Sequence, residues 1–393
     1  MALRTMIIDS NFMMHRFARS YDFIKFPEDD ATNYKISLAQ HIACEIERVG
    51  KFVDNIVLVK DSRSWRKDTE QIVSINWETG EPIKATDYKM NRTGSEESVR
   101  NDELLYNSFN EFTDCLEKDF NVPVTQIFGA EGDDAIWAWT KYLREQNVFT
   151  CVYCSDSDII QTVTPSNSII RRVRSKIAQD GEIVIHPMLW EQMNAFKGDP
   201  FNYNPLKWQH EQFMIGQRNL ESGLRIENPN WTKLQLMILG SGKDNVQEIF
   251  NWPSTNGTQT RHIGAKHIVS ALEKVNVPIN SITEKILYDD SFIKELYINI
   301  VNAAKPKNSN ETITKIFESF ESNSDSYMEK IKSNRKMGLL NTIEVPIEVQ
   351  NNLFEKIKVQ SKMLSDMKGM SSSQNICEAL NVTRNKLFQN LGI

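Results

Sequence analysis

The sequence predicts an α/β domain built on a parallel sheet, followed by a helical domain. In the first half of the chain, short apolar segments alternate with segments of helical periodicity, as in a parallel sheet whose strands are connected by helices. Each of the four main apolar segments ends at an acidic residue or cluster. From Trp231 onward, helical patterns predominate and are interrupted by polar, glycine-containing stretches.

Four segments are expected to form the sheet, with helices between them. The strands are predicted over Arg4–Asp9, Asn55–Asp61, Val122–Phe128 and Val148–Cys154. The clearest helical patterns cover Ile36–Val53 and Asp133–Gln146. Two further apolar runs, Ile169–Arg174 and Glu182–His186, flank Gln179-Asp180-Gly181, which predicts a hairpin.

The division between the domains is expected near residue 215. Residues 1–215 would form the α/β domain and residues 216–393 the helical domain. Two polar breaks, Gly240–Asn245 and Pro253–Gly264, interrupt the helical region. Residues 190–229 have no clear assignment, and a last amphipathic helix is expected over Gln374–Leu391.

Composition sets limits on function. Lys and Arg total 46 and Asp and Glu total 52 among the 393 residues, a net charge of −6, which excludes a polycation of the packaging type. A local basic face for nucleic acid is still compatible with this charge. No apolar run approaches the ~18 residues of a membrane span, so no membrane association is expected. The odd count of five Cys favours a reducing, cytoplasmic location.

Acidic residues follow the predicted strands. Because the carboxyl ends of parallel strands share one edge of a sheet, these carboxylates should converge and require cations. Oxygen-only ligands select Mg²⁺ or Mn²⁺, and two such ions ~4 Å apart form the usual clamp for attack on a phosphodiester. Each acid alone could instead be a helix cap or a solvated loop residue, but four clusters together favour a metal site. The acids are Asp9, Asp61, Glu131, Asp133, Asp134, Asp156 and Asp158.

Basic and aromatic residues lie close to these acids in the sequence. Arg63, Arg66 and Lys67 follow Asp61 directly, and Tyr88-Lys89-Met90-Asn91-Arg92 opens a polar segment. Contacts to phosphate would require such side chains near the metals. The alternative interpretation is a solvated surface run of charge.

The ordered set of motifs resembles the 5′ nuclease (flap endonuclease) family, and within it the T-even-type phage replication ribonucleases H. The resemblance covers roughly residues 1–350. Leu239–Asn245 and Ile263–Lys266 resemble the family's helix-three-turn-helix DNA-binding element, expected over about residues 231–275. Asn334–Lys336 and Val345-Pro346 also resemble a stretch near the end of such proteins.

The resemblance implies roles for these residues. Two Mg²⁺ ions are expected, with Mn²⁺ able to substitute. The first ion would be held by Asp9, Asp61, Glu131 and Asp133, and the second region would comprise Asp134, Asp156, Asp158 and Asp244. Lys89 and Arg92 would contact the scissile phosphate at the mouth of a helical arch over about residues 84–116, where Tyr88 would stack on a terminal base.

The element around Gly240 also carries expectations. Gly240-Ser241-Gly242-Lys243 is not a P-loop, because Asp244 follows the Lys where Ser or Thr is required. The resemblance implies that this hairpin binds duplex phosphates, with a K⁺ ion. The DNA-binding residues would be Arg63, Arg66, Lys67, Gly240, Gly242, Lys243, Gly264 and Lys266.

Two departures from the family pattern accompany this element. Ser241 stands where the family has a second acid, which weakens the second metal site. Asn251–His262 occupies the place of a shorter connection, so an extra loop is expected.

The expected activity is that of a 5′-3′ exonuclease and flap endonuclease with ribonuclease H activity in DNA replication. Its partners would be DNA and RNA–DNA duplexes with 5′ ends or flaps, a single-stranded-DNA-binding protein and a sliding clamp, with the chain acting as a monomer in a phage-infected host cell. One alternative is a structure-specific binding protein with a weakened nuclease site, which Ser241 favours. Another is a ribonuclease of the related small nuclease-domain superfamily, which the arch and the Gly240–Lys266 element disfavour.

Overall fold

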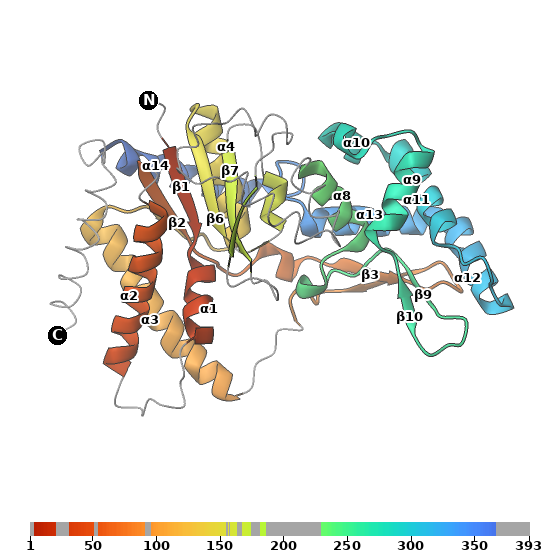
Figure 1. The fold of residues 1–393 in the computed structure, drawn as a ribbon, viewed down its shortest axis with the longest axis horizontal. Helices are drawn as coiled ribbons and strands as arrows, with labels where there is room; N and C mark the ends of the chain where they lie inside the picture. Colours follow the sequence, from red (N-terminus) through yellow and green to blue (C-terminus); the bar gives the residue numbers. More distant parts are fainter. Residues whose placement is uncertain are drawn as a thin grey trace.

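The central feature of the fold is one mixed sheet (Figure 1). The computed structural model describes residues 4–20, 31–50, 54–90, 96–154, 156, 158–162, 167–173, 181–185 and 229–366. The strand order is β5-β2-β1-β6-β7-β8, and all neighbours are parallel except β7 and β8. The strands are β1 (Arg4–Asp9), β2 (Asn55–Val59), β5 (Val124–Thr125), β6 (Phe149–Cys154), β7 (Asn167–Val173) and β8 (Gly181–Ile185).

This sheet confirms the predicted α/β class and the hairpin formed by β7 and β8. β1 has the predicted bounds, whereas β5 is shorter than the predicted Val122–Phe128. Only Val124 and Thr125 pair with β2, opposite Leu58 and Val59. Pro123, which has no N–H to donate to a ladder, precedes this pair.

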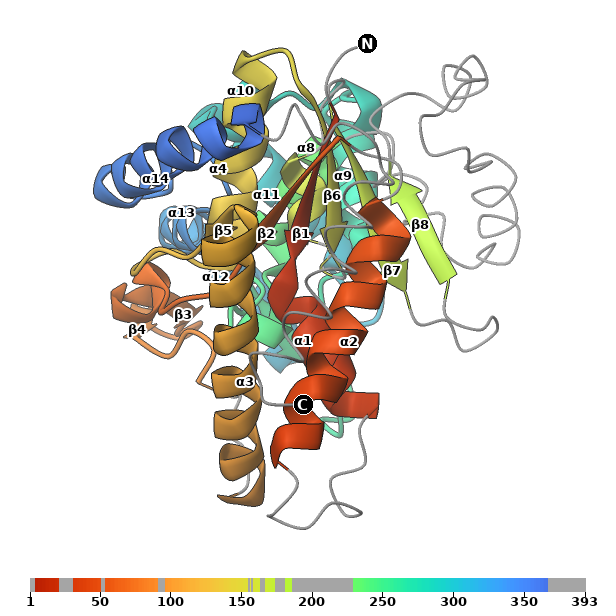
Figure 2. The same ribbon diagram turned by 90° about the vertical axis from the view of Figure 1, so that its left-hand side faces the viewer.

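Helices cover both faces of the sheet (Figure 2). The strand residues alternate between the two sides: Met6 and Ile8 of β1 pack in one hydrophobic cluster, and Ile7 packs in the other. The first cluster is completed by α1 (Ser10–Ser20), α2 (Ala31–Gly50) and α3 (Glu96–Phe120). The second is completed by α4 (Gly132–Glu145) and α14 (Ile347–Asp366). We call the sheet with these helices the sheet lobe.

A second group of elements, residues 229–338, forms a helical lobe beside the sheet (Figure 1). Its core includes Trp231, Phe250, Tyr297 and Phe320. The predicted break Pro253–Gly264 contains most of a small β-hairpin, which confirms an extra loop at this place. The elements are α8 (Pro229–Leu239), β9 (Asn251–Pro253), β10 (Thr260–His262), α9 (Ala265–Lys274), α10 (Glu284–Leu287), α11 (Asp290–Ala304), α12 (Glu311–Ser322) and α13 (Ser324–Gly338).

Two elements pack across the domain division expected near residue 215. The hairpin β3 (Gln71–Ile75) and β4 (Pro82–Ala85) packs on α13, with Ile75 in the core of the helical lobe. In the opposite direction, α14 returns to the sheet lobe and packs on α4. The division itself stays a prediction, and the packing shows that the two lobes exchange elements.

The predicted arch segment consists of β4, a turn and α3 in the part that the structure describes. Lys84 lies in β4, and the residues of α3 from Leu105 onward pack in the sheet lobe. Arg92, most of residues 190–229 and the predicted helix Gln374–Leu391 lie outside the described residues. Within the described ranges, no helix combines the length and apolar character needed to cross a bilayer.

Candidate active site

Acidic side chains meet at the carboxyl edge of the parallel sheet. Asp9 is the last residue of β1, which pairs with both β2 and β6. Asp61 follows β2, Asp156 follows β6, and Glu131 caps α4 after β5. Because these strands run in the same direction, their ends deliver the acids to one place, as the sequence predicts.

Backbone N–H groups position the acids. Asp9 Oδ1 accepts from Phe12 N at 3.1 Å, so Asp9 also caps the start of α1. Asp61 Oδ1 accepts from Gly132 N at 2.7 Å. A Cβ on Gly132 would lie 2.9 Å from that oxygen, so only glycine allows the helix to approach so closely. Asp156 Oδ1 accepts from Asp158 N at 3.0 Å.

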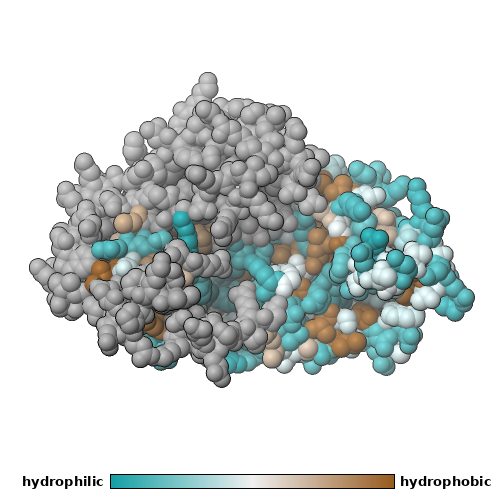
Figure 3. Space-filling view, turned by 60° about the horizontal axis from the view of Figure 1, so that its bottom comes forward, coloured by the Kyte–Doolittle hydropathy of each residue, from teal (hydrophilic) through white to brown (hydrophobic). Residues whose placement is uncertain are grey.

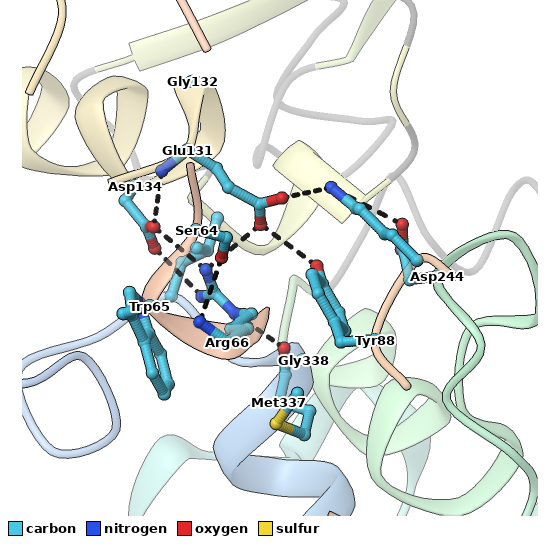
Figure 4. Close-up of polar contacts among 12 residues, drawn as sticks. Ser64, Trp65, Arg66, Tyr88, Glu131, Gly132, Asp134, Asp244, Met337 and Gly338 are labelled. Atoms are coloured by element: carbon cyan, nitrogen blue, oxygen red, sulfur yellow. Dashed lines mark hydrogen bonds and ion pairs between the residues drawn. The ribbon is translucent and has the colours of Figure 1, made fainter. Parts of the chain in front are cut away.

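Glu131 is the hub of a buried polar network (Figure 4). Its Oε2 accepts from Tyr88 OH at 3.0 Å and from Arg66 Nη1 at 3.2 Å, and its Oε1 pairs with Lys89 Nζ. Although burial raises the pKa of Glu131, the guanidinium of Arg66 and the ammonium of Lys89 outweigh it and hold this pKa below its ordinary value. Glu131 is therefore ionised at neutral pH.

Asp134 lies apart from the converging acids. It is fully buried, and its two oxygens accept from Arg66 Nη2 and Nη1, each at 2.9 Å. Oδ2 also accepts from Glu131 N at 3.0 Å, which closes the capping box of α4. With both oxygens engaged in this way, Asp134 supports Glu131 and Arg66 and does not sit in the second metal region expected from the resemblance.

Arg66 and Tyr88 also differ from the roles expected for them. Arg66 is only 2% exposed, and its Nε donates to Met337 O at 2.8 Å, so it cannot reach a DNA phosphate in this arrangement. Tyr88 is 5% exposed, which leaves no open ring face for a base to stack on. Both side chains instead hold Glu131 in place.

Lys89 lies between the two lobes in a left-handed backbone conformation, with φ of 57°. This conformation is unfavourable for a residue with a Cβ. It is fixed by the helical lobe, because Lys89 N donates to Asp244 O at 3.0 Å. The ammonium pairs with Glu131 and lies 3.6 Å from Asp244 Oδ1. The structure thus places Lys89 at the acids, and its expected contact with the scissile phosphate stays a prediction.

Lys243 also points at the acids rather than outward to a duplex. Its Nζ lies 3.1 Å from Asp158 Oδ2 and pairs with Asp156 Oδ2. Ser241, two residues earlier, donates from its hydroxyl to Asp244 Oδ2 at 2.7 Å. These contacts support a role for Lys243 in pairing with the acids, and they do not support the expected role in binding phosphate.

Burial and, after it, mutual repulsion raise the pKa of several of the carboxyl groups. Burial and the charge of Asp61 raise the pKa of Asp9 to about 7. Burial and Asp156 raise the pKa of Asp133 well above its ordinary value, and the same two causes raise that of Asp158. Sites with this electrostatic signature require either protons or cations to neutralise them.

The donor set suits a hard divalent cation. A cavity of about 30 Å³, which is room for an ion or one or two waters, is lined by four acids together with Arg66, Tyr88 and several apolar side chains. The four acids are Glu131, Asp133, Asp158 and Asp244. As the described side chains stand, no three acidic, His or Cys residues among them are grouped closely enough to ligate one ion. The lysine contacts would have to shift as an ion enters, since carboxylate oxygens now pair with ammonium groups.

Small residues shape the turn of the predicted DNA-binding element. Gly240 has φ of 66°, and a Cβ there would overlap Val246 O, so the turn requires glycine. Gly242 and Gly264 have no atoms within 4 Å of a Cβ position, which keeps the backbone around them open. Lys266 is exposed in the first turn of α9.

The remaining predicted DNA-binding residues are on the surface of the sheet lobe. Arg63 is exposed and pairs with Asp68 at 2.5 Å, and Lys67 is exposed beside it in the turn Trp65–Asp68. Figure 3 shows hydrophilic residues interspersed with hydrophobic patches on the face of the helical lobe that it presents.

Sequence reasoning missed two polar side chains behind the acids: Asn334, which ties α13 to its neighbours within the helical lobe, and Gln161, which joins the sheet lobe to the end of α13. Asn334 Nδ2 donates to Met237 O at 3.1 Å and to Gln247 O at 3.0 Å. Gln161 Nε2 donates to Gly338 O at 3.0 Å, and Leu340 N donates to Gln161 Oε1 at 2.8 Å. Only the Asn334–Lys336 motif pointed to this region, without indicating its role.

No family model and no curated protein matches the sequence. The flap endonuclease of bacteriophage T5, in a pseudo-enzyme–product complex with DNA and metal ions, is 14% identical, with a TM-score of 0.45 over 95% of this chain and 99% of that chain. The T5 5′-exonuclease with bound zinc is 13% identical, with a TM-score of 0.42 over 96% of this chain and 99% of that chain. Similarity at this level does not decide the function of this chain.

Proposed function

We propose that this chain is a 5′ nuclease of the flap endonuclease family that depends on divalent metal ions. Its substrates would be DNA and RNA–DNA duplexes with 5′ ends or flaps, including the RNA primers of replication. The observation that supports this most is the convergence of Asp9, Asp61, Glu131, Asp133, Asp156 and Asp158 at the carboxyl edge of a parallel sheet, with Lys89 held against them. The pattern is typical of sites that bind hard cations and act on phosphate esters.

The metal would be held chiefly by Asp9, Asp61, Glu131 and Asp133. A divalent ion there would supply Lewis-acid polarisation of the phosphodiester and a water of lowered pKa. Arg66 and Tyr88 fix the Glu131 carboxylate through Oε2, so that its orientation is set before substrate binds. The ammonium of Lys89, already at the acidic edge, would offset negative charge that develops on the phosphate.

The helical lobe and the exposed basic side chains of the sheet lobe would bind the duplex. The open backbone around Gly242 and Gly264 and the ammonium of Lys266 suit contacts with phosphate, with a K⁺ ion as a further ligand of the turn. Arg63 and Lys67 would contact phosphate near the acids. Contacts of this kind position a duplex without reading its sequence.

The deciding experiment is a cleavage assay on three 5′-labelled substrates: a flap, a nicked duplex and an RNA–DNA hybrid, each with Mg²⁺ or with EDTA. We expect Mg²⁺-dependent release of 5′ products by the wild type. Asp156→Asn should reduce the rate at least tenfold, a loss of at least ~1.4 kcal/mol in transition-state stabilisation. The matched control is Asp325→Asn, which alters an exposed acid of α13 that pairs with Lys294. It should retain the wild-type rate.

A second candidate function is a structure-specific nucleic-acid-binding protein with a weakened nuclease site. The ammonium of Lys243 between Asp156 and Asp158 favours it, because the ion pairs neutralise acids that a nuclease would use for metal. Binding of the flap substrate without Mg²⁺-dependent cleavage of any of the three substrates would support this candidate and contradict the nuclease.

A further inference from the structure

Lys243 reaches from the helical lobe to the acids that follow β6. Its Nζ pairs with Asp156 Oδ2 and lies 3.1 Å from Asp158 Oδ2, and its side chain is 41% exposed. Lys243 is the middle residue of the short helical turn Gly242–Asp244. An ammonium therefore stands between two carboxylates, in the kind of position that a bound cation takes.

The turn that carries Lys243 is closed by Ser241. The hydroxyl of Ser241 donates to Asp244 Oδ2 at 2.7 Å, and Asp244 N donates back to Ser241 O at 3.0 Å. Ser241 is neutral where the family resemblance expects an acid, and Lys243 adds one positive charge.

The electrostatics keep these ion pairs charged. Burial lowers the pKa of Lys243, but Asp158 and Asp156 outweigh burial and raise this pKa well above its ordinary value. In turn, although burial opposes it, Lys243 lowers the pKa of Asp156.

The acids at the other end of the cluster differ in this respect. Among the described residues, no ammonium forms an ion pair with Asp9 or Asp61, which are held by the backbone N–H groups of Phe12 and Gly132. A bound ion could relieve the repulsion between these two carboxyl groups. The two ends of the acidic edge are thus unequal in their need for a metal.

We propose that the ammonium of Lys243 replaces the second divalent ion, so that this chain binds one divalent ion where related carboxylate nucleases bind two. The inference rests on the proposed function, because it concerns the metal content of the same site. A tethered ammonium neutralises Asp156 and Asp158 without a dissociation step, but it cannot polarise a water as a divalent ion does. The remaining ion would carry that chemistry alone.

The test is the number of Mn²⁺ ions bound by the full chain, measured by titration with the free-ion electron paramagnetic resonance signal as readout. We expect one ion per wild-type chain. Lys243→Met keeps the length of the side chain and removes the charge, so it should bind two ions through Asp156, Asp158 and Asp244. Lys243→Arg keeps the charge and should bind one, as should Lys274→Ala, an exposed lysine of α9 used as the control. Circular dichroism of each variant checks that it is folded.

Each outcome bears on the inference separately from the nuclease activity. Two ions on the wild type, or one ion on folded Lys243→Met, would overturn the inference while leaving Mg²⁺-dependent cleavage as evidence for a nuclease. One ion on the wild type and two on Lys243→Met would support the inference, and absence of cleavage in the same preparation would then reject only the proposed function. No bound ion on any variant would reject both.

Discussion

Arg66 shows how strongly a single buried cation can organise an acidic site. Its guanidinium pairs with Asp134 and Glu131, and its Nε donates to Met337 O, so one side chain joins α4 to the end of α13. Removal of one partner from such a network leaves charges that are buried and uncompensated. Loss of a buried ion pair in this way costs about 3–5 kcal/mol.

We therefore expect Arg66→Ala to lower the free energy of unfolding by about 3–5 kcal/mol in urea denaturation. Arg63→Ala provides the control, because Arg63 is an exposed arginine in the same segment whose pair with Asp68 is open to solvent. Its denaturation midpoint should match that of the wild type. Equal midpoints for the two variants would contradict the role assigned to Arg66.

Tyr88 gives a prediction that separates the structural role from the stacking role. If the ring stacked on a base, Tyr88→Phe would retain activity, because phenylalanine has the same ring face. The hydroxyl instead donates to Glu131 Oε2 at 3.0 Å. We expect Tyr88→Phe to lower cleavage or to raise the Mg²⁺ requirement by about 10–100-fold, as is typical of groups that orient metal ligands. A Mg²⁺ titration of the cleavage rate measures this, and a curve identical to the wild type would restore the stacking role.

Asp9 links the acidic edge to pH. Its pKa is raised from 3.8 to about 7 by burial and by Asp61, so the folded state binds a proton that the unfolded state releases. Without divalent ions, the free energy of unfolding should fall as the pH rises through this range. Asp9→Asn removes the effect and still accepts from Phe12 N. In EDTA at pH 8 we expect it to be more stable than the wild type by up to about 4 kcal/mol, with the difference vanishing near pH 4.

Thermal unfolding at a series of pH values in EDTA measures this effect. Asp114→Asn, which changes an exposed acid of α3, should show the pH dependence of the wild type. A metal-free Asp9→Asn variant that loses stability with pH as steeply as the wild type would show that Asp9 does not carry the repulsion.

At the scale of the elements, α9 should contribute to nucleic-acid affinity through Lys266 alone. Lys243 pairs with acids in the protein, whereas Lys266 is exposed in the first turn of α9. Lys266→Ala should therefore reduce the magnitude of the slope of log affinity against log salt by about 0.9, the value for one duplex phosphate contact. Lys274→Ala, at the other end of α9, should leave the slope unchanged in fluorescence anisotropy titrations of a flap substrate. An unchanged slope for Lys266→Ala would exclude α9 from the duplex interface.

The elements also show what sequence patterns can and cannot predict. β1 and β6 were predictable because each is a short, largely apolar run with an acid at its end or just after it, and α4 because its apolar residues follow a helical period behind an acidic cap. The hairpin of β3 and β4 was missed because β4 is largely exposed and has no apolar alternation. The convergence of the acids followed from strand direction alone. The burial of Arg66, Tyr88 and Asp134 did not, because a side chain's partners depend on packing between distant segments.

On the scale of the whole molecule, α14 belongs to the core of the lobe formed by the start of the chain. Leu353 and Ile357 are fully buried in the cluster that contains Ile7, Val57 and Trp139. Gln360 Nε2 donates a hydrogen bond to Val124 O at 2.8 Å, and Gln360 Oε1 accepts one from Thr125 Oγ1 at 2.6 Å. An amphipathic pattern predicts the helix but not the surface on which it packs.

Leu353→Ala should therefore destabilise the sheet lobe. A buried leucine replaced by alanine costs about 2–5 kcal/mol, because a cavity remains. Val359→Ala lies on the same helix but is 62% exposed and should cost little. Unfolding followed by the fluorescence of the buried tryptophans of α4 measures both variants. If Leu353→Ala matched Val359→Ala, α14 would not contribute to the core of the sheet lobe.

The contact between Arg66 and Met337 O has a consequence for the order in which the molecule is made. Domains generally fold in sequence as a nascent chain leaves the ribosome. Here the acids at the start of the chain acquire their final support only after residue 337 has been translated, and the sheet that carries them is covered only after α14 has followed. In the newly made N-terminal half, the acidic site is therefore incomplete. The site is completed late in translation, together with the rest of the fold.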